Sequence, residues 1–296
     1  MKTPTWMSSI KKQQTDWMAF SSCHQGASHL AAGKVCQDAA YARYFEGDAY
    51  AVAIVSDGHG SSNYFRSDRG SRLAVEAARE GIEGFMRECM KQKQEERLRG
   101  KPDDFMHRLE ANICYLWRKK IAADYGEEPF TPEELALMTD EARRKYEASP
   151  NERFPKAYGA TLIAVVVYPD HFWMGLHIGD GKCVAQRKDG SFFQPIPWDD
   201  KCFLNVTTSL CDPNPLESFR HCFHTGDFPQ AIFVGSDGVD DSFANDEDLY
   251  GFYEEVARTF RTNKYKEAYA EVDAFLPELS KKGSGDDISV SVVVHI

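Results

Sequence analysis

The apolar residues of this chain fall into short, dense runs that end in turns rich in glycine and aspartate. Runs of about four to eight residues with many β-branched side chains are typical of buried β-strands. The pattern predicts strands within residues 49–60, 161–186, 230–235 and 288–296. The second range contains breaks at Pro169-Asp170 and Gly179-Asp180-Gly181, which predict hairpin-like connections inside it.

A second pattern, with apolar positions three and four residues apart, predicts amphipathic helices. The expected helices are Ser67–Met90, Asp103–Asp124, Thr131–Ser149, Asp246–Thr262 and Tyr265–Leu279. Long helices separated from groups of hairpin-linked strands favour an α+β fold over a parallel βαβ repeat. We therefore expect antiparallel sheets packed face to face, with the helices on the outside.

No internal repeat or low-complexity linker divides the 296 residues. We expect an N-terminal extension over residues 1–20 and a single domain over residues 21–296. Within that domain, residues 91–155 form a charged helical segment that is longer than a minimal connection. This segment is interpreted as surface helices that cover a sheet, with a docking element for a substrate or partner as the alternative.

The net charge of −11, from 35 Lys plus Arg and 46 Asp plus Glu, argues against nucleic acid and anionic membranes as partners. The sequence has no signal-peptide pattern and no run of eighteen apolar residues, so we expect a cytoplasmic protein. Its eight cysteines contain no CxxC pair and are expected to be reduced thiols. A zinc site among the cysteines and histidines of the C-terminal half is disfavoured, because the spacing of these residues matches no tight ligand pair. Its candidate ligands are Cys202, Cys211, His221, Cys222 and His224.

Four aspartate-glycine turns follow or precede apolar strands, and they carry the candidate chemistry. They contain Asp57, Asp180, Asp237 and Asp286. One such turn is ordinary, but four at strand ends would bring several carboxylates into a small volume. Carboxylates held together repel one another unless cations lie between them, and an all-oxygen site suits Mg²⁺ or Mn²⁺. The sequence therefore predicts a divalent metal centre.

The order of these turns resembles the signature of the metal-dependent type 2C serine/threonine protein phosphatases. The resemblance rests on Asp-Gly-His-Gly at 57–60, Gly-Ala-Thr-Leu at 159–162, Gly-Asp-Gly at 179–181, Ser-Asp-Gly-Val at 236–239 and Gly-Asp-Asp-Ile-Ser at 285–289. Residues 33–39 (GKVCQDA) are similar to the family's N-terminal acidic motif, so the likeness covers about residues 25–296. It implies a four-layer α/β/β/α sandwich of two antiparallel sheets flanked by helices, with metals in a cleft at one edge.

The resemblance also implies roles for single residues. Asp57 would bridge two Mg²⁺ or Mn²⁺ ions, the Gly58 carbonyl would bind one of them, and Asp237 and Asp286 would complete the pair. Asp180 resembles a ligand of a possible third ion, and Asp38 would ligate directly or from the outer shell. A metal-bridging hydroxide would then attack phosphoserine or phosphothreonine in line with the leaving oxygen. His59 would protonate that oxygen as the general acid.

Two positions depart from the family pattern. Gln37 stands where many relatives have glutamate, and a neutral amide ligates more weakly. Gly33 stands where many relatives have an arginine that clamps the substrate phosphate. His29 or Lys34 is expected to bind the phosphate instead, although lysine lacks the bidentate geometry of arginine.

The expected function is hydrolysis of a phosphorylated protein, in opposition to a serine/threonine kinase. Three alternatives remain at this point. They are a pseudophosphatase that binds a partner, a phosphatase of a small phosphorylated metabolite, and an acidic protein with a structural role only. The last leaves the ordered set of aspartate turns unexplained.

Overall fold

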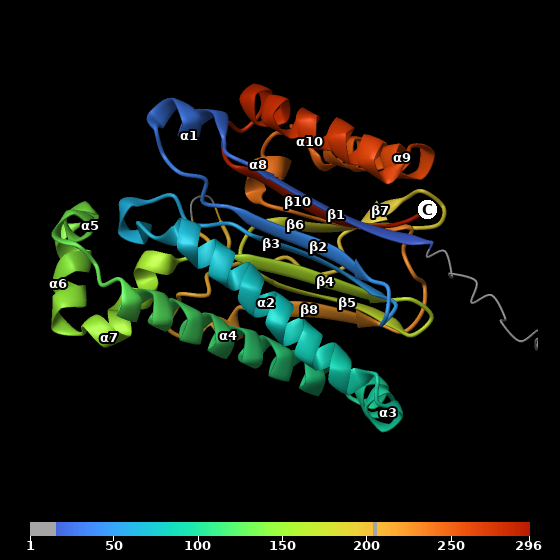
Figure 1. Cartoon of the computed structure of the whole chain (residues 1–296), viewed down its shortest axis with the longest axis horizontal. Coiled ribbons are helices and arrows are strands. Elements are labelled where there is room, and N and C mark those ends of the chain that lie inside the picture. Colours follow the sequence, from blue (N-terminus) through green and yellow to red (C-terminus); the bar gives the residue numbers. More distant parts are fainter. Residues whose placement is uncertain (1–15, 204–205) are drawn as a thin grey trace, which may run out of the picture.

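The computed structural model describes residues 16–203 and 206–296 and places two five-stranded sheets against each other (Figure 1). The strand order is β1-β10-β9-β6-β7 in the first sheet and β2-β3-β4-β5-β8 in the second. Every pairing in both sheets is antiparallel. Helices cover the outer face of each sheet, so the expected α+β sandwich with four layers is confirmed.

The first sheet consists of β1 (Trp17–His24), β10 (Ile288–His295), β9 (Ala231–Gly235), β6 (Lys182–Gln186) and β7 (Phe192–Phe193). The second consists of β2 (Ala39–Phe45), β3 (Tyr50–Ser56), β4 (Leu162–Tyr168), β5 (Phe172–Ile178) and β8 (Arg220–His224). The chain passes from one sheet to the other directly after β5. At this turn Gly179 has a φ of +118°, and a Cβ there would lie 2.4 Å from Cβ of Thr161. Only glycine fits, and the turn sets Asp180 at the edge of the sandwich.

Side chains alternate between two environments along the strands. Val55 and Val165 belong to the core between the sheets, whereas their neighbours Ile54 and Val166 pack on the helical side. Because both faces of the central strands are buried, these strands read as continuous apolar runs in the sequence.

Four long helices form the outer layers. Helices α2 (Ser67–Cys89) and α4 (Pro102–Glu127) pack on the second sheet, and α9 (Asp246–Thr262) and α10 (Tyr265–Lys282) pack on the first. The expected helices at these places are confirmed to within three residues at either end. No helix in the described part of the chain combines the length and the apolar character needed to cross a membrane.

The charged segment 91–155 contains α3 (Gln92–Gly100), α4, α5 (Pro132–Leu137), α6 (Asp140–Ala148) and α7 (Pro150–Arg153), followed by the 3₁₀ helix η2 (Phe154–Tyr158). The prediction of one helix over 131–149 is wrong. Met138 is extended and Thr139 starts a new helix, its side chain accepting from the Ala142 N–H at 3.3 Å. Figure 1 shows α5, α6 and α7 gathered at one end of the sandwich, beyond the start of α2.

The shorter elements are α1 (Ala27–Ala32), α8 (Asp237–Asp240) and the 3₁₀ helices η1 (Ser62–Tyr64) and η3 (Pro215–Glu217). Strands β1, β2, β7 and β8 were not predicted. They lie at the sheet edges or, in β7, span two residues, so their apolar patterns are weak. Trp17–Phe20, placed in the expected extension, form the first half of β1. Residues 1–15 of that extension lie outside the described residues.

Candidate metal centre and active site

The predicted aspartate turns meet at one end of the sandwich around a cavity of about 750 Å³. Asp57 follows β3, Asp180 lies between β5 and β6, Asp237 follows β9, and Asp286 precedes β10. All four line this cavity, together with Gly58, His59 and His29. Antiparallel strands from two sheets therefore deliver carboxylates from distant parts of the chain to one place.

The backbone around Asp57 is fixed from both sides. Its carbonyl accepts from the Thr161 N–H at 2.8 Å, and its own N–H donates to the Thr161 hydroxyl at 3.1 Å. The Gly58 N–H donates to the Gln37 carbonyl at 3.0 Å. Such contacts hold the Asp57 carboxyl in position before any ligand arrives.

The loops that carry Asp237 and Asp286 interlock. A Cβ on Gly238 would lie 2.0 Å from the Asp287 carbonyl oxygen, so a larger residue would force the two loops apart. The Ser284 hydroxyl donates to the Gly238 carbonyl at 2.9 Å and adds a second tie. The glycine after Asp237 is therefore required by close backbone approach as well as by the turn.

The cavity is unfavourable for negative charge without a cation. Burial, and then the nearby Asp237 carboxylate, raises the pKa of Asp57 well above its usual value. Burial also raises the pKa of Asp237 to about 6 and is the largest cause of the raised pKa of Asp180. Groups whose charged forms are destabilised in this way are stabilised when a divalent ion neutralises them.

Asp38 is not among the residues that line the cavity. Its side chain is buried, and its Oδ2 atom has no hydrogen-bond partner. Burial raises the pKa of Asp38, and the neighbouring Cys23 adds to the shift. An orphaned carboxylate oxygen beside three further carboxyl groups fits an oxygen-ligated Mg²⁺ or Mn²⁺ centre.

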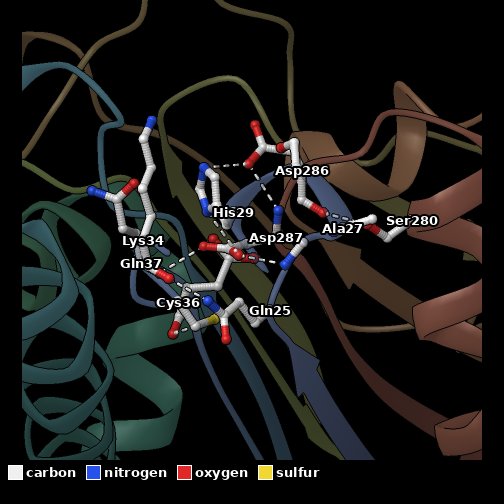
Figure 2. A network of polar contacts seen from close by, with 12 residues as sticks. Gln25, Ala27, His29, Lys34, Cys36, Gln37, Ser280, Asp286 and Asp287 are labelled. Atoms are coloured by element: carbon white, nitrogen blue, oxygen red, sulfur yellow. Dashed lines mark hydrogen bonds and ion pairs between the residues drawn. The ribbon is translucent and has the colours of Figure 1, made fainter. Parts of the chain in front are cut away.

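His29 connects α1 to the loop before β10 (Figure 2). Its Nδ1 lies 2.9 Å from Asp287 Oδ1, and its Nε2 lies 3.4 Å from Asp286 Oδ1. Asp287 also accepts from the backbone N–H groups of Gly26 and Gln37, both at 2.6 Å. The imidazole predicted to bind phosphate thus lines the cavity with a carboxylate near each nitrogen, although its Nδ1 makes no hydrogen bond of good geometry.

Gln37, which stands where many relatives have glutamate, connects the loop of His59 to the start of α2. Its side-chain amide donates to the His59 carbonyl at 3.1 Å and to the Ser67 hydroxyl. Lys34, the other predicted phosphate ligand, is not among the residues that line the cavity, and its carbonyl accepts from Gln25.

Lys156 is a cavity residue that the sequence reasoning missed. It lies in η2, and its Nζ is 4.4 Å from the centre of the Tyr64 ring, which in turn packs against the His59 ring with their centres 4.7 Å apart. Nothing in the sequence near position 156 marks it, because it stands just after the charged segment 91–155 and in none of the motifs. Asp241 and Asp212 also line the cavity; Asp241 stands two residues after the Ser-Asp-Gly-Val motif at 236–239, but no motif lies near Asp212.

Comparison with known proteins identifies the family of this chain. The model of a family described as protein phosphatase 2C matches residues 25–276. The chain belongs to the protein phosphatase 2C family. No curated protein matches the sequence.

Several solved bacterial structures share the protein phosphatase 2C fold with this chain. PppA of Pseudomonas aeruginosa, described as a key regulatory component of T6SS, is 15% identical with a TM-score of 0.56, covering 95% of this chain and 98% of that one. The Mycobacterium tuberculosis serine/threonine phosphatase PstP/Ppp is also 15% identical with a TM-score of 0.56, covering 94% and 98%. A PstP catalytic domain in complex with two manganese ions is 16% identical with a TM-score of 0.54, covering 94% and 97%. The resemblance inferred from the motifs is confirmed.

Proposed function

We propose that this chain is a metal-dependent phosphoprotein phosphatase that acts on phosphoserine and phosphothreonine. The observation that carries the proposal is the convergence of Asp57, Asp180, Asp237 and Asp286 on one cavity, with the pKa of the first three raised. A fold that keeps mutually repelling carboxylates together is organised around cations.

The residues that would hold two Mg²⁺ or Mn²⁺ ions are Asp57, the Gly58 carbonyl, Asp237 and Asp286. Asp180, which lines the cavity, would hold a third ion, and the buried Asp38 would support the centre without lining the cavity. When bound, such ions supply an activated water as the nucleophile and stabilise charge on the phosphoryl oxygens. His29, close to both Asp286 and Asp287, would help to position these carboxylates.

His59 is proposed to give its proton to the departing serine or threonine oxygen. Burial, and then the positive charge of Lys156, lowers the pKa of His59 to about 4, so the imidazole is neutral at pH 7 in the free cavity. A general acid must carry its proton, so this role requires the bound phosphate dianion to raise the pKa of His59. Lys156 is proposed to bind a phosphoryl oxygen from the same side, in the place of the missing arginine.

A protein substrate is favoured over a small metabolite by the surface beside the cavity. A groove of about 610 Å³ between α4, α6 and α7 adjoins the cavity and shares Lys156 and Asp212 with it. Arg118, Lys145 and Arg153 also line this groove. A peptide that places its phosphorylated residue over the metals can lay flanking residues along it, whereas a sugar phosphate leaves it empty. Such a substrate also implies an opposing serine/threonine kinase.

The test is hydrolysis of a phosphothreonine peptide with Mn²⁺, with EDTA, and by the Asp237→Ala variant. We expect turnover that needs metal and is lost in Asp237→Ala, while Asp246→Ala, which removes an exposed carboxylate that pairs with Lys182, keeps it. Sugar phosphates are assayed alongside. Preference for sugar phosphates would favour the metabolite phosphatase, and metal binding without turnover on peptide or aryl phosphate would identify a pseudophosphatase.

A further inference from the structure

A second group of metal-ligating side chains lies between α4 and β8, among residues that do not line the catalytic cavity. His107 and Glu110 come from α4, and His221 comes from β8, the edge strand of the second sheet. One potential ligand atom from each of the three lies within 4.8 Å of the other two. Asp103, one helical turn before His107, lies on the other side of the imidazole, with its Oδ1 3.5 Å from His221 Nε2, whereas Glu110 lies at Nδ1.

The positions follow from helix geometry. Residues 103, 107 and 110 are spaced four and three apart, so they share one stripe of α4. His221 meets that stripe from the strand: its Nδ1 lies 2.7 Å from Glu110 Oε1, and its ring centre lies 5.1 Å from that of His107. Ligand atoms around a tetrahedral zinc ion are about 3.3 Å apart, so side-chain shifts of about 1.5 Å or less close the group on an ion.

Burial distinguishes this group from an ordinary surface pair. The Glu110 side chain is 2% exposed and lies on the apolar face of α4, next to Leu109 and Ile113. A buried carboxylate is costly unless it is paired or bound to a cation. A neutral His221 donates one hydrogen bond to Glu110 but leaves its negative charge uncompensated, whereas a divalent ion compensates that charge while the imidazoles are neutral.

We propose that His107, Glu110 and His221 form a three-ligand site for a divalent transition metal of the zinc type that joins α4 to the edge strand β8. Two imidazoles and one carboxylate suit Zn²⁺, Co²⁺ or Ni²⁺, with water in the remaining position, whereas the all-oxygen centre in the cavity suits Mg²⁺ or Mn²⁺. The two sites therefore differ in the metal they select. The expected effect of occupancy is a tighter attachment of α4 to the sheet.

The experiment uses the full chain with Asp57→Asn and Asp237→Asn, which removes ligands of the catalytic centre and makes the result independent of the proposed phosphatase activity. Zn²⁺ binding is measured by calorimetry, and Co²⁺ binding by its visible absorption. We expect one ion per chain at the new site and an affinity at least about 10-fold lower after His107→Ala or Glu110→Gln. His107 is exposed, so its replacement leaves the packing of α4 intact.

His171→Ala is the matched control, because His171 also pairs with a glutamate, Glu95 at 2.9 Å, but belongs to no such group of three among the described residues. It should bind zinc as the parent does. Crystals soaked in Zn²⁺ should show anomalous scattering between α4 and β8 that is lost in His107→Ala. Unchanged affinity in His107→Ala, or no binding in excess zinc, would overturn the proposal and leave a plain ion pair between Glu110 and His221.

Discussion

At the scale of single residues, the cavity combines acidic groups that need a cation with few basic groups that can meet a phosphate. The basic side chains that line it are His29, His59 and Lys156. His29 is engaged by two carboxylates, which leaves His59 and Lys156 for the substrate. Both pack on Tyr64, so their positions are coupled. Variants of His59 and of Lys156 therefore test two different roles, proton transfer and phosphate binding.

His59→Ala tests the proton transfer. We expect kcat on a phosphothreonine peptide to fall by about 10²-fold, because an alkoxide leaving group needs a proton. An activated aryl phosphate has a good leaving group and should be affected far less. Steady-state kinetics on both substrates measures the difference, and equal losses on the two would remove the general-acid role from His59.

Lys156→Met tests the phosphate contact. We expect at least a 10-fold loss of kcat/KM on both substrate types, on the order of 1.4 kcal/mol of transition-state stabilisation. Lys34→Met is the paired variant, because Lys34 was the lysine predicted from the sequence but does not line the cavity. If Lys34→Met impairs hydrolysis and Lys156→Met does not, the original prediction is right and the contact proposed for Lys156 is wrong.

At the scale of elements, one buried arginine fixes the end of the charged segment. Arg66 donates to both carboxylate oxygens of Glu134, at 2.7 and 2.9 Å, and to the Tyr158 hydroxyl at 2.8 Å. Its guanidinium also stacks on the Phe130 ring at 4.7 Å. These contacts tie α5 and η2 to the start of α2, and η2 carries Lys156. Helix η2, which contributes Lys156 to the cavity, is thus held in place by Arg66, whose side chain does not line the cavity.

Replacing Arg66 should loosen this element. Arg66→Met leaves Glu134 and two backbone carbonyls without their donor, and we expect a loss of about 2–4 kcal/mol in the free energy of unfolding. Urea denaturation measures this loss, and limited proteolysis should show new cleavage within 128–158. Arg72→Met, which removes an exposed arginine 3.8 Å from Asp68, should change stability by about 0.5 kcal/mol or less. Comparable effects of the two variants would contradict the anchoring role.

At the scale of the whole molecule, the carboxylates make the metal-free protein sensitive to pH. The pKa of Asp237 is 3.8 in the unfolded chain and about 6 in the metal-free fold. Between these values the native state binds more protons than the unfolded state, so the free energy of unfolding falls as pH rises. Asp57, Asp180 and Asp38 shift in the same direction and add to the effect.

Metal-free protein should therefore have a lower Tm near neutral pH than at about pH 5, and Mn²⁺ should restore it. Asp237→Asn should raise the Tm of the metal-free protein near neutral pH by about 2 °C or more and reduce the gain from Mn²⁺. Thermal denaturation with and without EDTA measures both. A Tm for the metal-free protein that rises between these two pH values, or an Asp237→Asn variant less stable than the parent, would contradict the electrostatic account.

The sequence alone determined the layered α+β class, the long helices and the aspartate turns. Those features are local. The continuous apolar run of β3 and the helical spacing of apolar residues in α2 can be recognised without knowing any distant contact. Edge strands such as β2 and β8 were missed because their side chains are only half-buried and their pattern is mixed. They form because β3 and β5 each have one backbone edge to which a further strand can pair, and that edge exists only once the sheet is assembled.

Only the tertiary structure showed which further side chains, outside the recognised motifs, come into contact. Motif order anticipated that Asp57, Asp237 and Asp286 would converge, but not that Lys156 would meet His59 from a helical segment about a hundred residues away. Nor did spacing bring His107 and Glu110 to His221, which lies 111 residues after Glu110 in the chain. The physical reason is that sequence patterns report how each segment buries its own apolar side, whereas contacts between segments depend on how sheets and helices pack together.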